Sequence, residues 1–193
     1  GRHKEALNCF AKLTEQNPGD GRVYFYKGCE QYYLNQMLDA LESLNLALKL
    51  DGCCVNYMLK RGQVLCALGK IKESVVTYDT ALRQFPNNSE LHFSRAQALY
   101  KLNRLTGALE SFQKTLQLDE SNQEAHMSLA NTYFALERYE EAQKATDRVL
   151  KIDPHSRGAY DRKASCLIMI GRNFDALSVL EIALALSPSD PNA

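Results

Sequence analysis

The residues best equipped for chemistry in this chain are its cysteines and histidines, and their spacing matches none of the familiar reactive sites. No Cys-x-x-Cys pair occurs, and Cys53 and Cys54 are adjacent, which suits neither a zinc site nor a mutual disulfide. Free thiols in a reducing compartment are the simplest interpretation, so we expect a cytoplasmic protein. Asn87-Asn88-Ser89 is a glycosylation sequon that would matter only in the lumen of the endoplasmic reticulum, and that location stays open as the alternative.

Sequence motifs for catalysis are absent as well. The chain has no phosphate-binding GxxxxGK(S/T), no dinucleotide-binding GxGxxG and no zinc-binding HExxH pattern. Of the four histidines, His92 and His126 are 34 residues apart and fall where a helix would pack, so we expect them to be packing residues rather than ligands. We therefore predict a chain without catalytic activity, metal ion or cofactor.

The composition indicates a folded chain that is not steered toward nucleic acid or lipid. Of the 193 residues, 45% are hydrophobic and 24% are charged, as in soluble folded proteins. Lys plus Arg and Asp plus Glu both number 23, so the formal charge is zero and no long-range attraction to nucleic acid or acidic membranes is expected. No apolar run approaches the roughly 20 residues needed to span a bilayer. We predict protein partners, with neither nucleic-acid nor membrane binding.

The elements that must position any functional side chain follow a repeat of 34 residues. A small residue recurs at this interval without insertion or deletion, at Ala6, Ala40, Ser74, Ala108, Ala142 and Ala176. A second small position keeps the same phase, at Gly28, Gly62, Ala96, Ala130 and Ala164. A helix end is expected between the two small positions, at Asn35, Gly69, Asn103, Glu137 and Gly171. Apolar residues recur at helical spacing on either side, so the pattern predicts two helices per repeat, closely packed at the small residues.

This pattern resembles the tetratricopeptide repeat along the whole chain. Counted from the first residue of a repeat, it has a large residue at position 4, small residues at 8 and 20, an aromatic or large residue at 24 and, in three of the five full repeats, Pro at 32. Thr146 departs from the pattern at position 24. The usual Leu at position 7 is replaced by cations whose long stems could cover apolar surface, Lys27, Arg61, Arg95 and Lys163. The resemblance implies an all-α fold, a right-handed superhelical α-solenoid of antiparallel helix pairs.

The 34-residue register also predicts how the chain is divided. It gives half a repeat at 1–20, five full repeats at 21–54, 55–88, 89–122, 123–156 and 157–190, and a stub at 191–193. Solenoids need polar ends, and neither end here has a polar capping helix, so we expect a piece of a longer array. Leu177, Leu180 and Leu184 on the last helix would then lack a neighbour, and exposed terminal helices would offer a route to self-association.

The resemblance further implies where a partner would bind. In this family the first helix of each repeat lines a concave groove, with positions 5, 9 and 12 facing inward, so we expect an extended peptide or a helical segment of a partner protein there. Two apolar rows beside a row of neutral hydrogen-bonding side chains suit a peptide backbone flanked by apolar side chains. The predicted partner-binding residues are Phe25, Cys29, Tyr32, Leu59, Gln63, Phe93, Gln97, Tyr100, Met127, Asn131, Phe134 and Arg162.

Three kinds of function fit such a groove. We favour a non-catalytic interaction scaffold; the alternatives are a co-chaperone or client-holding module, and the regulatory arm of an enzyme whose catalytic domain is absent. Chaperone-binding members of the family hold a partner's C-terminal carboxylate with a clamp of Lys, Asn and Arg side chains. Only Asn131 and Arg162 match that clamp here. Glu90 and Glu124 would repel a carboxylate, and they also argue against an RNA-binding groove.

Overall fold

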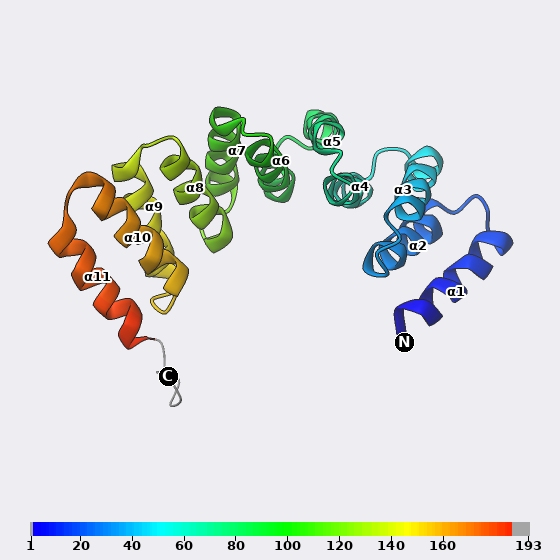
Figure 1. Cartoon of the computed structure of the whole chain (residues 1–193). Helices are drawn as coiled ribbons and strands as arrows, with labels where there is room; N and C mark the ends of the chain where they lie inside the picture. Colours follow the sequence, from blue (N-terminus) through cyan, green and yellow to red (C-terminus); the bar gives the residue numbers. More distant parts are fainter. Residues whose placement is uncertain (1, 187–193) are drawn as a thin grey trace. The chain divides into compact units, whose positions relative to one another are not determined.

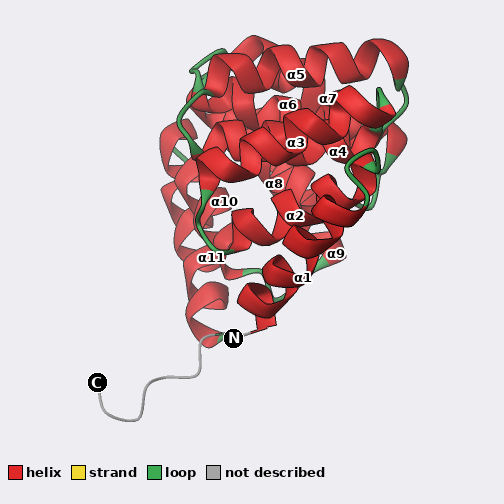
Figure 2. Ribbon diagram, turned by 90° about the vertical axis from the view of Figure 1, so that its right-hand side faces the viewer, coloured by secondary structure: helices red, strands yellow, loops and turns green. Residues whose placement is uncertain are grey.

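The computed structural model describes residues 2–186, and in that range the chain forms eleven α-helices and no strand (Figure 1). Figure 2 shows the same helices joined by short loops. The first helices of the predicted repeats are α2 (Gly21–Tyr33), α4 (Val55–Ala67), α6 (Ser89–Lys101), α8 (Gln123–Ala135) and α10 (Arg157–Ile170). The second helices are α1 (Arg2–Gln16), α3 (Met37–Asp51), α5 (Ile71–Gln84), α7 (Leu105–Leu118), α9 (Tyr139–Ile152) and α11 (Asn173–Ala185).

The all-α fold and the α-solenoid class predicted from the sequence are confirmed. The exact repeat boundaries stay a prediction, and the stub at 191–193 lies outside the described residues. The chain divides into two compact units, residues 1–102 (unit 1) and residues 103–193 (unit 2). Within each unit every helix packs against the next along the chain, and first helices also touch one another, α2 with α4, α4 with α6 and α8 with α10. Each unit therefore presents a layer of first helices that can share one surface.

The helix ends follow the predicted residues. All five residues expected to end a first helix have positive φ, between 57° and 85°, and so turn the chain in the left-handed conformation: Asn35, Gly69, Asn103, Glu137 and Gly171. Gly and Asn adopt this conformation readily, whereas Glu137 does so at a cost in free energy. At the other end, Asn88 and Asn122 cap α6 and α8 by accepting a hydrogen bond from a backbone N–H of the first turn.

The predicted close approach at the small residues is confirmed in unit 1. A Cβ added to Gly28 would lie 3.0 Å from Cγ of Leu44 on α3. A Cβ added to Gly62 would lie 2.6 Å from the hydroxyl oxygen of Tyr78 on α5, and closer still to two of its ring carbons. Tyr78 is 1% exposed, so its ring fills the space that Gly62 leaves. The paired helices can pack at this distance only because no side chain stands between them.

The predicted packing role of His126 is confirmed, since it is 8% exposed. Its Nε2 donates a hydrogen bond to the carbonyl oxygen of Glu120 (2.9 Å), and Nε2 of His92 donates likewise to Pro86 (2.8 Å). A carbonyl oxygen only accepts, so Nε2 carries the proton in both rings and is not available to a metal. Tyr160, at the same place in the next repeat, donates its hydroxyl to the carbonyl oxygen of Pro154 (3.1 Å).

The last helix, α11, is apolar on more than one face. Leu177 and Leu184 are exposed, as predicted for residues without a neighbour, and Phe174 is 88% exposed. The prediction was wrong for Leu180, which packs against the cluster formed by Ala164, Leu167 and Ala176 because it faces α10. None of the helices in residues 2–186 combines the length and the apolarity that crossing a membrane requires.

Candidate functional site

A pocket of about 220 Å³ in unit 1 is lined mainly by the first helices α2, α4 and α6. Three of the predicted partner-binding residues meet there, Tyr32, Gln63 and Gln97, one from each helix. The pocket arises because the 34-residue repeat places equivalent side chains of successive helices side by side. Its full lining is Tyr32, Gln63, Cys66, Ala67, Tyr78, Ser94, Gln97, Ala98 and Lys101, and we call it the concave pocket.

The lining of the concave pocket can recognise both polar and apolar groups. The amides of Gln63 and Gln97 each offer a donor and an acceptor, as a peptide backbone requires. Lys60 places its Nζ 4.9 Å from the centre of the Tyr32 ring and 5.6 Å from that of Tyr33, a cation–π arrangement. No ion pair joins Lys60 to a carboxylate within residues 2–186. Lys60 therefore places a positive charge against Tyr32, one of the aromatic residues that line the pocket.

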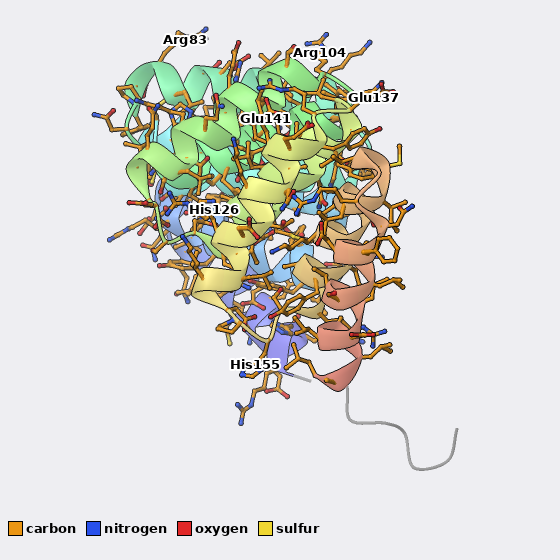
Figure 3. The ribbon with its side chains drawn as sticks, turned by 90° about the vertical axis from the view of Figure 1, so that its left-hand side faces the viewer. Arg83, Arg104, His126, Glu137, Glu141 and His155 are labelled. Atoms are coloured by element: carbon orange, nitrogen blue, oxygen red, sulfur yellow. The ribbon has the colours of Figure 1, made fainter. Side chains whose placement is uncertain are left out.

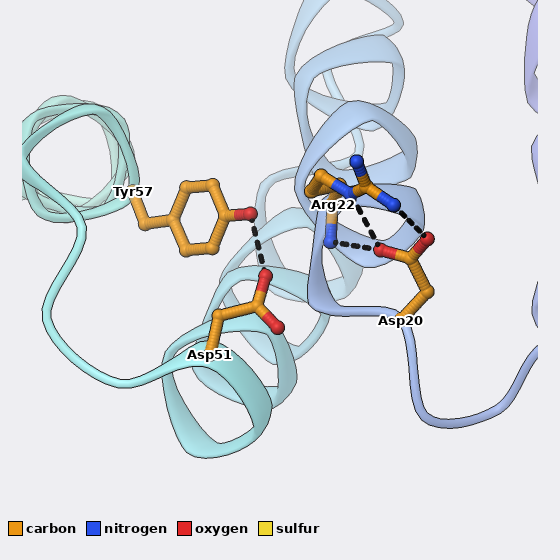
Figure 4. A network of polar contacts seen from close by, with 4 residues as sticks. All are labelled: Asp20, Arg22, Asp51 and Tyr57. Carbon is orange, nitrogen blue, oxygen red and sulfur yellow. Dashed lines mark hydrogen bonds and ion pairs between the residues drawn. The ribbon is translucent and has the colours of Figure 1, made fainter.

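Aromatic rings continue along the first helices beside the concave pocket. Phe25 stacks on Tyr57 with 4.7 Å between ring centres, and the edge of Tyr26 meets Phe25 at 5.3 Å. Tyr57 is held in place because its hydroxyl donates a hydrogen bond to Asp51 (2.8 Å; Figure 4). Burial, together with this hydrogen bond, raises the pKa of Tyr57. The ring that supports Phe25 is therefore fixed at both its face and its hydroxyl.

The cysteine in this region is poorly suited to nucleophilic chemistry. Cys29 is half-buried on α2, and burial raises the pKa of its thiol, an effect that the charge of Lys60 only partly opposes. A thiol with a raised pKa stays protonated at neutral pH and reacts slowly. Among the described residues, no three His, Cys, Asp or Glu side chains come close enough together to hold a metal ion. In unit 2, the buried His126 and the exposed His155 lie apart from each other (Figure 3).

Sequence reasoning missed Tyr78 as a residue of the concave pocket. Tyr78 belongs to α5, a second helix, which was not expected to reach this surface. Its ring passes through the space beside Gly62 and emerges in the pocket, while burial raises its pKa. The signal was present in the sequence, because a Gly at the small position opposite a Tyr leaves room for a long side chain. Ser94 and Lys101 also line the pocket without having been among the predicted site residues.

The remaining predicted residues of unit 1 differ in how much surface they offer. Leu59 is 5% exposed and can contribute little to a partner, because it faces the core between helices. Phe25, Cys29 and Phe93 are half-buried, and Tyr100 is exposed at the end of α6. Their role in binding stays a prediction.

Unit 2 carries the other predicted residues on α8 and α10. The guanidinium carbon of Arg162 lies 4.6 Å from the centre of the Phe134 ring, and Phe134 in turn meets the edge of Tyr139. Oδ1 of Asn131 and Nε of Arg162 are buried and have no hydrogen-bond partner within residues 2–186. Unpaired buried polar atoms cost free energy. Asn131 and Arg162 therefore mark the place in unit 2 where hydrogen bonds to a bound polar group would lower the free energy most. Met127 is half-buried nearby on α8.

Two family models describe parts of this chain, both as tetratricopeptide repeat, over residues 59–125 and 99–162. Together they span more than half of the sequence. Among curated proteins, U-box domain-containing protein 70 of Oryza sativa subsp. japonica is 27% identical over 90 residues, and the Hsp70-Hsp90 organizing protein of Triticum aestivum is 26% identical over 90 residues. Both matches cover 47% of this chain, but only 11% and 16% of the lengths of those proteins.

Solved structures share the fold over nearly the whole chain. A MamA structure from Desulfovibrio magneticus RS-1 superposes with a TM-score of 0.83 at 16% identity, covering 89% of this chain and 97% of that one. YrrB, described as a TPR protein with an unusual peptide-binding site, gives a TM-score of 0.78 at 24% identity, with 94% and 93% coverage. The uninterrupted 34-residue register, the left-handed residue that ends each first helix and these matches lead to one assignment: the chain belongs to the tetratricopeptide-repeat family.

Proposed function

We propose that the chain is a non-catalytic interaction scaffold that binds an extended segment of a partner protein at the concave pocket of unit 1. The observation that carries this proposal is the meeting of Tyr32, Gln63 and Gln97, from three successive first helices, around one cavity. The cavity is smaller than the roughly 300–1,000 Å³ of typical small-molecule sites, and it suits a single side chain of a longer ligand. The peptide-binding site named for YrrB, which has the same fold, supports the same kind of ligand.

The chemistry of the pocket supports an extended peptide over a charged polymer. Two amides one repeat apart can hold two separate backbone groups of an extended peptide, while Tyr32 and the neighbouring rings bury its apolar side chains. Aromatic residues are enriched in the cores of protein interfaces for this reason. In unit 2, Asn131, Phe134 and Arg162 offer a second contact surface of the same composition, and we include it in the proposal.

The experiment is a selection of peptides from a displayed library, followed by affinity measurements on substituted chains. Replacing both Gln63 and Gln97 by Ala removes two hydrogen bonds of about 1 kcal/mol each, so we expect affinity to fall by roughly tenfold or more with unchanged helicity. The matched control is Gln16→Ala, which removes an exposed amide of α1 in the same unit. If the double variant bound the peptide with unchanged affinity, the concave pocket would not be the binding site.

The likeness to an Hsp70-Hsp90 organizing protein favours one second candidate, a co-chaperone function, although it covers only 90 residues. A co-chaperone of the clamp type needs a free C-terminal carboxylate on its ligand. We propose to compare selected peptides that end in a free carboxylate with the same peptides ending in an amide. Equal affinities would rule out the clamp, whereas a loss of binding by the amides would favour it. We keep the cytoplasm as the proposed location, since all six cysteines are free thiols.

A further inference from the structure

Three of the four cations at position 7 of the repeats, to which the sequence pattern assigns no role, form bonds to the preceding repeat: Arg61, Arg95 and Lys163. Nε of Arg95 lies 2.6 Å from Oδ1 of Asp79, and Nζ of Lys163 lies 2.6 Å from Oδ1 of Asp147. In both pairs the carboxylate is sixteen residues before the cation and belongs to the second helix of the previous repeat. The carboxylate neutralises a cation that is partly withdrawn from water, as a half-buried charge requires.

Arg61 occupies the same position, but it has no carboxylate opposite it. Its Nε donates to the amide oxygen of Asn45 (2.7 Å), the residue sixteen positions earlier, and a terminal N–H donates to the hydroxyl of Thr77. Both acceptors are neutral, and burial lowers the pKa of Arg61. No ion pair links Arg61 to a carboxylate in the described part of the chain: Glu73 acts on Arg61 through its charge, but its carboxylate pairs with Lys70. Three of its five N–H groups remain for another acceptor.

Arg61 lines a pocket of about 350 Å³ between α3, α4 and α5, which is larger than the concave pocket. It shares no residue with the concave pocket, and we call it the outer pocket. Its complete lining is Leu48, Met58, Arg61, Lys72, Glu73, Val76, Thr77 and Thr80. Leu48 and Met58 supply apolar walls, while Arg61 and Lys72 supply positive charge against the single, already paired Glu73. The pocket is thus apolar with a net positive end.

The edge of the outer pocket is also unusual within the repeat. Val76 is 63% exposed, although it is apolar and β-branched. The residues at the same position of the other second helices are charged or polar, Asn8, Glu42, Glu110, Lys144 and Ser178. The pocket therefore differs at two independent places: it lacks the carboxylate that pairs with Arg95 and with Lys163, and it has an exposed apolar side chain at its rim. Both differences favour a ligand that brings an acid and an apolar group.

We propose that the outer pocket binds a segment of a partner protein that presents a glutamate side chain next to an aliphatic one. The glutamate carboxylate takes the place opposite Arg61 that Asp79 and Asp147 fill in two other repeats, and the aliphatic side chain packs on Met58 and Val76. A glutamate offers two oxygens to the guanidinium, and such bidentate pairs are stronger than bonds to neutral acceptors. This site is separate from the concave pocket and does not depend on it.

The test uses the whole chain with its methionine methyl groups labelled for NMR, and N-acetyl-Leu-Glu-Leu-amide as the probe. We expect a saturable shift of the Met58 methyl at millimolar peptide, with Met127 and Met169, which lie in unit 2, unaffected. The same peptide with Gln in place of Glu should bind at least tenfold more weakly, because it loses the charge. No saturable shift at Met58, or equal affinities of the two peptides, would overturn the proposal.

Substitutions in the protein make the test specific. Asn45→Asp installs the carboxylate that pairs with the cation in two other repeats, so it should keep the fold and weaken binding of the Glu peptide about tenfold by competing for Arg61. Arg61→Gln should remove the preference for Glu over Gln, while Arg95→Gln, the matched control, should leave it intact. The Gln63→Ala, Gln97→Ala chain should bind the Glu peptide normally, which separates this site from the concave pocket. Wild-type affinity in the Asn45→Asp chain would refute the role of Arg61.

Discussion

Gly62→Ala adds one methyl group at the tightest helix contact in unit 1. The new Cβ would lie 2.6 Å from the hydroxyl oxygen of Tyr78 and nearer to its ring, closer than real Cβ atoms approach. Tyr78 is 1% exposed and cannot swing into solvent. The neighbouring hydroxyls of Ser74 and Ser94 also bond to Tyr78 and fix it. Either α4 and α5 must move apart or the ring must leave its preferred position.

Two opposing effects set the size of the change. Ala is a better helix former than Gly by about 1 kcal/mol, which would stabilise α4. Overpacking a tight core costs about 1–3 kcal/mol and more where backbone must shift. We expect a net loss of about 1–2 kcal/mol. Gly158→Ala is the matched control, because its Cβ would lie 3.8 Å from Cε of Met127, an ordinary contact. That substitution should gain up to about 1 kcal/mol from helix propensity alone.

Urea unfolding followed by circular dichroism would measure both variants, with midpoints compared because repeat arrays need not unfold in one step. The double variant Gly62→Ala, Tyr78→Leu reproduces the Ala164 and Leu180 pair, which packs at the same positions of the last repeat. Gly62→Ala should lower stability less in a chain that already carries Tyr78→Leu than in one that keeps Tyr78. If Gly62→Ala were as stable as the parent chain, the close contact between α4 and the Tyr78 ring would be wrong.

Three further outcomes are expected. Phe93→Ala or Phe134→Ala should weaken binding of a selected peptide severalfold with little loss of helicity, and unchanged affinity for both would contradict the predicted groove. Glu137→Gly should raise stability by about 1 kcal/mol, because Glu137 has φ 59° and Gly adopts that conformation without strain; a lower melting temperature would contradict this explanation. The raised pKa values of Tyr57 and Tyr78 mean that stability is full below the unfolded-state pKa of about 10 and declines as pH rises above it. Urea midpoints measured on either side of that pH should show the decline, and Tyr57→Phe should reduce its slope.

The helical fold could be predicted because its determinants are local and recur. A residue that tolerates positive φ ends each first helix, and Asn35, Gly69 and Gly171 are of the types that do so most readily. The register then assigns each side chain to a face of its helix. That is why Tyr32, Gln63 and Gln97, chosen by position alone, come together around one pocket. Among these five residues, only Glu137 is of a type that disfavours positive φ. Its place in the 34-residue repeat predicted the helix end there, whereas its residue type alone did not.

The features that escaped prediction depend on pairs of helices. Tyr78 reaches the concave pocket only because Gly62, sixteen residues earlier on another helix, has no side chain. Leu59 is buried although its repeat position predicted a surface role, because packing between helices decides which edge of a helical face stays open. The partners of Arg95 and Lys163 were not recognised either, although the common sixteen-residue spacing of Asp and cation could have revealed them.

Helix α4 explains why unit 1 can hold two separate pockets. Successive residues of an α-helix are about 100° apart, so Arg61 and Gln63 point about 160° away from each other. Gln63 lines the concave pocket and Arg61 the outer pocket, and the two linings share no residue. Gly62 lies between them and lets α5 pack closely enough to supply Tyr78 to the first pocket and Thr77 to the second. A side chain at Gly62 would therefore disturb both pockets together, whereas substitutions of Arg61 or Gln63 should disturb one at a time.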